Sequence, residues 1–276
     1  MPQRYCWDDN VLLQAVILAP DEGGAETSWK SAGGTDAVAF ICLGGFFHRL
    51  NMLEPYAGHR NNLQVILANC SNRFGHLLLD NLGMQYDVMT PDKDEALKIP
   101  DYFSPSQYVE EIAKNNARGV AKYHTFSAYE KPLVVIGVDT IVVTDGEIYV
   151  KPKDMDEIIA LFKKLSGKHH DIFTGVSIIY GIDYYKDPPE YKMRTFFEKT
   201  SVKMMELTEE EILDYLSMGE SEYRVGGYAI EAQGCSLFEY IDGDYMTAVG
   251  LPIHRIAKEF RDLFEANLIP THNYYE

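Results

Sequence analysis

The sequence predicts a mixed α/β fold, and three features of the chain from about residue 63 onward carry this prediction. Apolar, β-branched runs of strand length alternate with stretches whose apolar residues recur at helical spacing. Ser, Thr and Pro residues stand where helices would begin, and Gly residues stand where helices and hairpins would turn. The two kinds of segment succeed one another along the chain, which is typical of a sheet covered by helices.

Bulk composition narrows the class of protein. The chain has 276 residues, of which 46% are hydrophobic and 24% charged, so it can bury a substantial core. Its net charge of −17 disfavours a nucleic-acid polymer or a membrane surface as a partner. The four cysteines lie far apart without paired spacing, which predicts a reduced, cytoplasmic protein without a disulfide framework. The longest apolar run, from Ala37 to Phe47, is too short to span a bilayer.

Residues 1–61 differ from the rest of the chain. They combine a Gly-rich segment with apolar runs, but helices and strands do not alternate there. We therefore expect an N-terminal extension of uncertain order over residues 1–61 and a folded domain over residues 62–276.

Within the expected domain the elements follow in a definite order. Ser104 and Thr208 are the expected caps of two helices, and Asp145-Gly146 is the expected turn of a hairpin. A buried strand is expected to end at Asp139, and Gly167 to cap the end of a short helix. The remaining strands are expected at residues 64–67, 85–89, 171–180 and 195–207, followed by two short strands and a closing helix.

The loop "ANCSNRF", which begins at Ala68, is the first candidate site. It joins a buried strand to a helix, so free backbone N–H groups and the positive end of the helix dipole would face an anion. Ser71 and Arg73 would add a hydroxyl and a guanidinium. The alternative is an ordinary helix cap beside a solvated arginine. A thiol phosphatase using Cys70 is disfavoured, because "CSNR" leaves too little loop to surround a phosphate.

Acidic and basic residues form the second candidate site. Asp92, Asp94 and Glu95 share one loop, for which a solvated turn is the alternative. Asp139 follows the apolar run "VVIGV", where a carboxylate is costly to bury without a metal, a cation or hydrogen bonds. Lys151 follows the hairpin and faces either phosphates or water.

Six stretches carry a family resemblance: "VILANCSNR", "VVIGVDTIVV", "GEIYVKPKD", "KLSGKHHDIFTGV", "GGYAIEAQG" and "GDYMTAVGLP". In order and spacing they resemble the motifs of the Maf-type nucleoside triphosphate pyrophosphatases, particularly the Maf domain of acetylserotonin methyltransferase-like proteins. The likeness runs from about Leu63 to Phe264. It implies a Maf/inosine triphosphatase-like mixed sheet with helices that form a two-lobed cleft.

The resemblance also implies an activity and a set of roles. The expected reaction is hydrolysis of a nucleoside triphosphate, of the dTTP/UTP type, to a monophosphate and pyrophosphate with Mg²⁺ or Mn²⁺. Asp139 matches the family's proton acceptor, and Glu95 and Asp139 match its metal ligands. The remaining matches are Lys151 as a catalytic lysine, and Ser71, Arg73, Thr140 and Glu231 as substrate-binding residues.

Several positions depart from the family pattern. Phe74 replaces an arginine and Asn116 replaces a lysine, so two cations are missing from the expected phosphate site. Glu231 replaces a glutamine that helps to choose the base, which predicts an altered base preference. These departures predict slowed turnover. They leave open a non-catalytic Maf-like protein that binds a nucleotide or a partner, and a homodimer also stays open. A small-molecule phosphatase is a weaker alternative.

Overall fold

A computed structural model describes residues 40–43, 46–49, 52–68, 72–91, 104–122, 132–183, 186, 190–221 and 224–269. The chain forms two compact units, Met1–His48 and Arg49–Glu276. Near the end of the first unit, β1 (Phe40–Leu43) and β2 (Phe46–Arg49) form a two-stranded sheet. The second unit begins with the 3₁₀-helix η1 (Glu54–Tyr56) and α1 (Ala57–Asn61). The predicted boundary between residues 61 and 62 stays a prediction.

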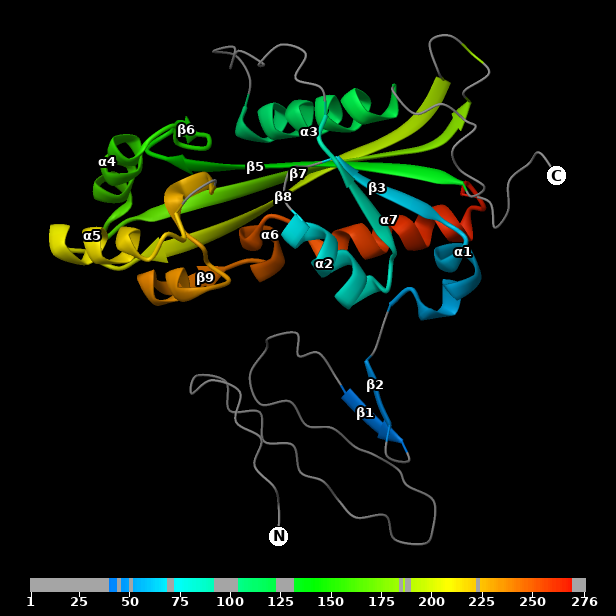
Figure 1. The fold of residues 1–276 in the computed structure, drawn as a ribbon, viewed down its shortest axis with the longest axis horizontal. Helices are drawn as coiled ribbons and strands as arrows, with labels where there is room; N and C mark the ends of the chain where they lie inside the picture. The colour runs from blue at the N-terminus through cyan, green and yellow to red at the C-terminus, as the bar shows by residue number, and fades with distance from the viewer. Residues whose placement is uncertain are drawn as a thin grey trace, which may run out of the picture. The chain divides into compact units, whose positions relative to one another are not determined.

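The second unit alternates strands and helices, in agreement with the predicted α/β class (Figure 1). Its strands are β3 (Gln64–Ala68), β4 (Tyr86–Met89), β5 (Leu133–Thr144), β6 (Glu147–Tyr149), β7 (His169–Asp183), β8 (Glu190–Met204) and β9 (Phe238–Asp242). Its later helices are α2 (Asn72–Leu82), α3 (Pro105–Ala121), α4 (Met155–Leu165), α5 (Glu209–Ser217), η3 (Val225–Gly227), η4 (Gln233–Leu237), α6 (Tyr245–Val249) and α7 (Ile253–Glu265).

A mixed seven-stranded sheet organises this unit. The strand order is β4-β3-β5-β7-β8-β9, and β6 pairs with β5. β3 runs parallel to both β4 and β5, whereas β7, β8 and β9 pair antiparallel with their neighbours. Parallel pairing requires a helical crossover, which α2 and α3 supply. The mixed sheet expected from the sequence is therefore confirmed; the two-lobed cleft stays a prediction.

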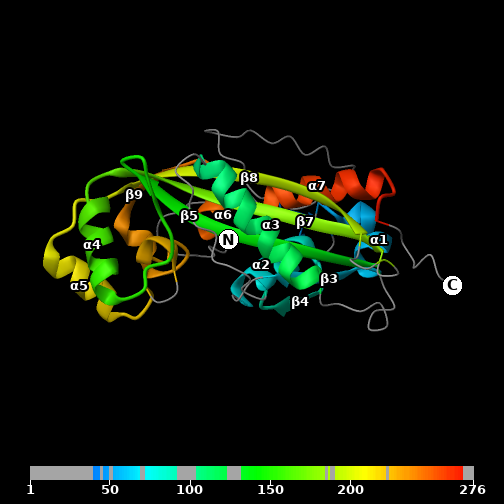
Figure 2. The ribbon, with the colours of Figure 1, turned by 90° about the horizontal axis from the view of Figure 1, so that it is seen from above.

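Helix α3 lies directly on one face of the sheet, across β5 and β7 (Figure 2). Two strand glycines permit this close approach. A Cβ built on Gly137 would lie 2.2 Å from the carbonyl oxygen of Ala113, and one built on Gly175 would lie 2.5 Å from that of Val109. Since backbone atoms of α3 occupy both places, any side chain there would push the helix off the sheet.

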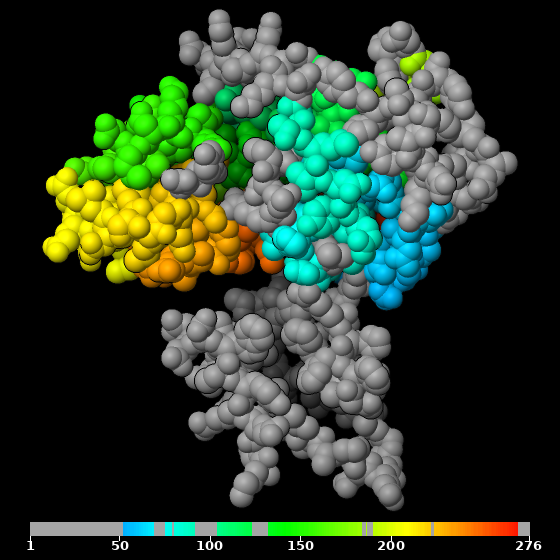
Figure 3. All heavy atoms as spheres, viewed as in Figure 1, coloured from blue at the N-terminus to red at the C-terminus, as the bar shows by residue number. Residues whose placement is uncertain are grey.

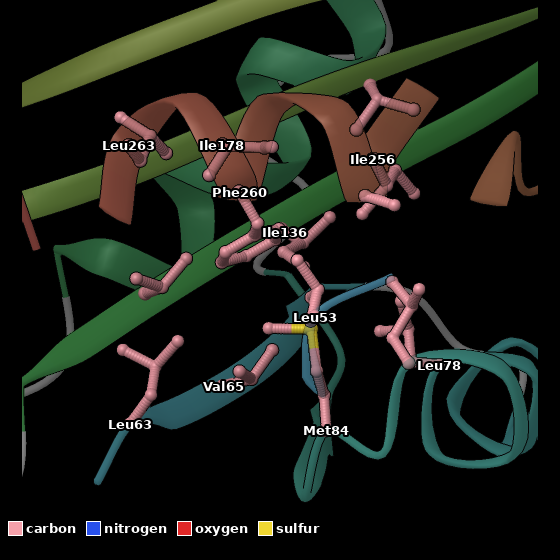
Figure 4. Packing of buried hydrophobic residues seen from close by; sticks show 14 of the residues in the cluster. Leu53, Leu63, Val65, Leu78, Met84, Ile136, Ile178, Ile256, Phe260 and Leu263 are labelled. Atoms are coloured by element: carbon pink, nitrogen blue, oxygen red, sulfur yellow. The ribbon is translucent and has the colours of Figure 1, made fainter. Parts of the chain in front are cut away.

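The opposite face of β5 is covered by the first of two large hydrophobic clusters. Its side chains come from β3, β5, β7, α2 and α7, and Leu53 joins them from the segment before η1 (Figure 4). Ile136 and Phe260 are fully buried at its centre. The second large cluster joins α4, α5, η4 and α6 to the other ends of the same long strands.

Most local predictions are confirmed. Ser104 and Thr208 both form capping boxes, and Asp145 and Gly146 turn the hairpin with φ values of 52° and 78°. Two predictions are wrong. β5 continues past Asp139 to Thr144, because β7 pairs with it as far as Val143. Only β9 forms among the described residues of the last part of the chain, because Gly226 and Gly227, with positive φ, turn the preceding segment into 3₁₀ structure. No helix within the described ranges is both long and apolar enough to cross a membrane.

Candidate active site

The candidate site lies at an open stretch of the β5 edge. β3 pairs with β5 only as far as the Ala68–Gly137 pair, and β6 pairs with it only from Val142. Among the residues that the structure describes, no strand pairs with this edge between those two points. Asp139 lies in the gap, in the middle of β5 and not at its end as predicted. The carboxyl end of β3, which leads towards α2, therefore lies beside Asp139.

The environment of Asp139 holds its proton unusually tightly. Burial raises the pKa of the Asp139 carboxyl from 3.8 to about 7, although the Thr140 N–H and the Lys151 charge both act to lower it. Burial also raises the pKa of Tyr108 on α3, and the charge of Asp139 adds to that shift. A carboxylate with such a pKa is poised to accept a proton near neutral pH.

Lys151 enters the site from the β5–β6 hairpin. It lies two residues after the end of β6, and its charge reaches Asp139, so the structure brings these two predicted residues together. The hairpin itself is tied to α4, because Lys164 binds both Glu147 and Tyr149. Tyr149 also donates to Glu147 at 2.5 Å. This anchorage limits where Lys151 can lie.

The predicted phosphate loop is described only in part. Ser71 lies outside the described residues, as does Glu95, the predicted metal ligand. For Arg73 the structure gives the backbone position, in the first turn of α2. These three assignments stay predictions.

Thr140 and Asn116 both have partners inside the protein. The Thr140 and Thr174 hydroxyls lie 3.0 Å apart, and Thr174 donates to the Thr247 carbonyl at 2.9 Å. The Asn116 amide donates to the Val138 carbonyl at 3.0 Å. The Asn116 amide therefore has a partner on β5, and its side chain fixes the backbone next to Asp139.

Glu231 lies in a separate part of the chain, paired with Arg224. Both side chains are partly exposed. Burial raises the pKa of Tyr245, and the charges of Glu231 and Cys235 raise it further, which places the half-exposed Tyr245 near Glu231. A glutamate carboxylate paired with an arginine accepts hydrogen bonds but donates none.

Sequence reasoning missed Tyr108 and Arg224. Tyr108 occupies an apolar position of α3 and looks like a core residue, so nothing in its spacing signals contact with Asp139. Arg224 immediately precedes "VGGYAIEAQG", and a basic residue within seven positions of an acidic one was an available signal.

The donors at this site suit a hard divalent cation. No group of three or more His, Cys, Asp or Glu residues in the described part of the chain is arranged to hold a metal. Mg²⁺, however, commonly binds one or two carboxylates together with substrate phosphates. Asp139 supplies one such carboxylate, and its raised pKa shows that nearby positive charge does not fully compensate it. A bound cation would supply the missing charge.

A mixed sheet that holds a carboxyl of raised pKa near a lysine suits a hydrolytic site in an α/β protein. Comparison with protein families gives a match to the Maf-like protein family over residues 64–263. The chain belongs to this family.

Individual relatives agree with that result. The chain is 34% identical to a dTTP/UTP pyrophosphatase of Thermoanaerobacter sp. (strain X514), with 75% of the chain and 100% of the relative covered. It is 35% identical to a dTTP/UTP pyrophosphatase of Bacillus cereus (strain Q1), with 76% and 98% covered. It is also 34% identical to a human protein named probable bifunctional dTTP/UTP pyrophosphatase/methyltransferase, where the match covers 77% of the chain but only 34% of the relative.

Proposed function

We propose that this protein is a nucleoside triphosphate pyrophosphatase, which hydrolyses its substrate to a nucleoside monophosphate and pyrophosphate. The observation that carries the proposal is Asp139, whose carboxyl pKa is raised to about 7 at an open strand edge beside Lys151. Relatives whose whole length, or nearly so, is covered by the match are named dTTP/UTP pyrophosphatases, which supports the same reaction.

In the proposed mechanism, the Asp139 carboxylate accepts a proton from a water molecule. The water oxygen forms a bond to the α-phosphorus, and the bond from that phosphorus to the bridging oxygen breaks, so pyrophosphate leaves. Lys151 pairs with the triphosphate, and the Arg73 side chain together with the first turn of α2 bind its anionic oxygens. General-base catalysis of this kind typically contributes about 10²–10⁴ in rate.

We further propose that a divalent cation, Mg²⁺ or Mn²⁺, is bound by Asp139 and Glu95. When bound, it offsets the charge of the triphosphate and of the leaving pyrophosphate. Asp139 would then serve both the cation and the water.

Turnover is proposed to be slow and the base preference altered. Phe74 and Asn116 supply no charge to the phosphates, and Asn116 is engaged with the Val138 carbonyl. Glu231, ionised beside Arg224, would accept from the exocyclic amine of cytosine but would face a carbonyl of uracil or thymine. We therefore propose a preference that has moved from UTP and dTTP towards CTP.

Pyrophosphate release from UTP, dTTP, CTP and purine triphosphates, with Mg²⁺ or Mn²⁺, tests the proposal. Activity should depend on the cation, and Asp139→Asn should lower kcat by about 10²–10⁴. Asp214→Asn on the exposed side of α5 is a matched control and should leave the rate unchanged. Wild-type turnover by Asp139→Asn would exclude Asp139 as the base. Nucleotide binding without any pyrophosphate release would favour the non-catalytic alternative.

A further inference from the structure

The segment Tyr228–Leu237, which we name the Glu231 loop, is held by groups outside the candidate active site. It leaves the sheet region after η3 and returns to it at β9, so its ends are fixed. Internal turns connect Ala232 N–H to the Ala229 carbonyl and Cys235 N–H to the Ala232 carbonyl, both at 3.0 Å. Glu231 lies at the exposed side of this loop.

Glu220 binds the far side of the same loop. It follows α5, and its two carboxylate oxygens accept from the main-chain N–H groups of Gln233 and Gly234, each at 3.2 Å. In Figure 3 the surface of α5 lies directly beside that of the loop. One carboxylate therefore fixes two consecutive peptide units that begin two residues after Glu231.

Tyr215 connects Glu220 to the start of the loop. Its hydroxyl accepts from the Ala229 N–H at 2.9 Å and donates to Glu220 at 3.3 Å. The ring is 4% exposed and packs on Phe162 of α4, with ring centroids 5.7 Å apart. Burial raises the pKa of Tyr215 to about 12, so the hydroxyl keeps its proton and can donate.

Gly234 of the loop lies too close to Ala229 and Tyr215 to carry a side chain. A Cβ built on Gly234 would lie 2.5 Å from the Ala229 carbonyl oxygen and 2.8 Å from the Tyr215 hydroxyl. The two ends of the turn around Glu231 are thus drawn together, with Ala229 and Gly234 in close contact. On the sheet side, Tyr228 bonds to His170 at 2.7 Å.

We infer that Glu220 and Tyr215 are positioning residues that preset the Glu231 loop for base selection. This inference rests on the proposed function, because it assigns base recognition to Glu231. A loop whose polar groups are held before the nucleotide arrives loses little freedom on binding, and so discriminates more strongly between bases. Neither residue is expected to touch the nucleotide.

The test measures binding without turnover. The α,β-methylene analogues of UTP and CTP cannot be cleaved at the reacting bond, and their dissociation constants for the full chain with Mg²⁺ give a selectivity ratio. Glu220→Gln places an amide NH₂ against a main-chain N–H, and Tyr215→Phe removes the hydroxyl but keeps the ring. Each should bring the ratio at least about fivefold closer to one, since a misplaced polar group discriminates poorly.

Two further variants sharpen the result. Glu211→Gln is the matched control, because Glu211 also accepts a main-chain N–H, that of Thr208 on the same helix, but lies outside the loop. It should leave the ratio unchanged. The double variant of Glu220 and Tyr215 should change the selectivity ratio no more than the larger single change. Both residues belong to one hydrogen-bond network that holds the loop.

Amide hydrogen exchange separates positioning from general weakening. In Glu220→Gln the amides of Gln233 and Gly234 should exchange faster, while those of β5 should not. Faster exchange with an unchanged ratio would overturn the inference, and so would a wild-type ratio near one. If wild-type protein binds neither analogue and releases no pyrophosphate, the proposed function fails, and the inference fails with it. A changed ratio without turnover would support the inference and reject catalysis.

Discussion

Asp139 shows how one residue meets opposing demands of stability and reaction. A carboxylate at a partly buried strand position is costly, because its charge loses hydration. Here Thr140 N–H and Lys151 compensate only part of that loss, and the carboxyl pKa stays raised at about 7. The same incomplete compensation makes the carboxylate a better proton acceptor.

The stability of the metal-free protein should therefore depend on pH through Asp139. The folded state binds this proton more tightly than the unfolded chain, because the pKa is raised from 3.8 to about 7. Its stabilising contribution is fully present below about pH 4 and is lost as pH rises through about 7, by at most about 4 kcal/mol. Asp139→Asn should melt at a higher temperature than wild type at about pH 8 and at a similar temperature at about pH 4.

Thermal unfolding in a chelator at both pH values measures this effect. Asp214→Asn, on the exposed side of α5, should shift the two melting temperatures equally. A melting temperature of Asp139→Asn below that of wild type at about pH 8 would contradict the prediction, because it would mean that the charged carboxylate stabilises the fold.

At the scale of elements, the contact of α3 with the sheet fixes the site. Gly137 and Gly175 let the helix backbone approach β5 and β7, and Asn116 then reaches the Val138 carbonyl. The same helix brings Tyr108 to Asp139. The lack of side chains at Gly137 and Gly175 thus determines the surroundings of Asp139, the proposed base.

Gly137→Ala should destabilise the protein severely, by more than about 3 kcal/mol, because its Cβ would lie 2.2 Å from a helix carbonyl oxygen. Gly58→Ala in α1 is the matched control, since a Cβ there meets no atom within 4 Å. It should be neutral or stabilising by about 0.5–1 kcal/mol. Denaturant unfolding compares the two. Equal effects would show that α3 yields to the added methyl group.

The sequence predicts the features that depend only on residues adjacent along the chain, such as helix caps and turns. Capping at Ser104 and Thr208 and the turn at Asp145 are decided by a few adjacent residues, and all three predictions are confirmed. The position of Asp139 within β5 depends instead on how far β7 pairs with that strand, which β5 itself does not encode. The contacts of Glu220 with Gln233 and Gly234 likewise require a closed loop that local patterns do not reveal.

At the scale of the whole second unit, three strands are common to both large hydrophobic clusters. β5 contributes Ile136 to one cluster and Val142 to the other, and β7 contributes Ile178 and Ile172 in the same way. β8 also supplies residues to both. The candidate site lies along β5 between the two contributions, so its geometry depends on both clusters.

His170, which packs against Tyr228 and Phe238, should contribute stability that is lost in acid. It is 2% exposed, and burial lowers its pKa from 6.5 to about 4. Nε2 bonds to Tyr228, but Nδ1 has no hydrogen-bond partner among the described residues, so a second proton would be unsatisfied. The contribution to stability is present above about pH 6.5 and is lost as pH falls towards about 4, by at most about 3 kcal/mol.

Unfolding free energies between about pH 7 and about pH 5 measure this loss. His170→Phe should be less stable than wild type near neutrality, because Tyr228 loses its partner, but this difference in unfolding free energy should shrink as pH falls. The opposite pH dependence of Asp139 is common to both proteins and cancels in the difference. The adjacent, exposed His169 provides the control, and His169→Gln should keep the wild-type slope. An equally steep slope in His170→Phe would place the acid sensitivity elsewhere.

The strands shared by both clusters also determine whether the two clusters unfold together or separately. If one cluster melted alone, half of β5, β7 and β8 would keep its cover while the other half exposed its apolar face to water. Such a partly melted form would be costly and prone to aggregate, so both clusters should be lost in one cooperative step. Amides of β3 and α5 should then share one exchange midpoint in denaturant, even in a variant weakened only at His170. Two separate midpoints would show that the halves melt independently.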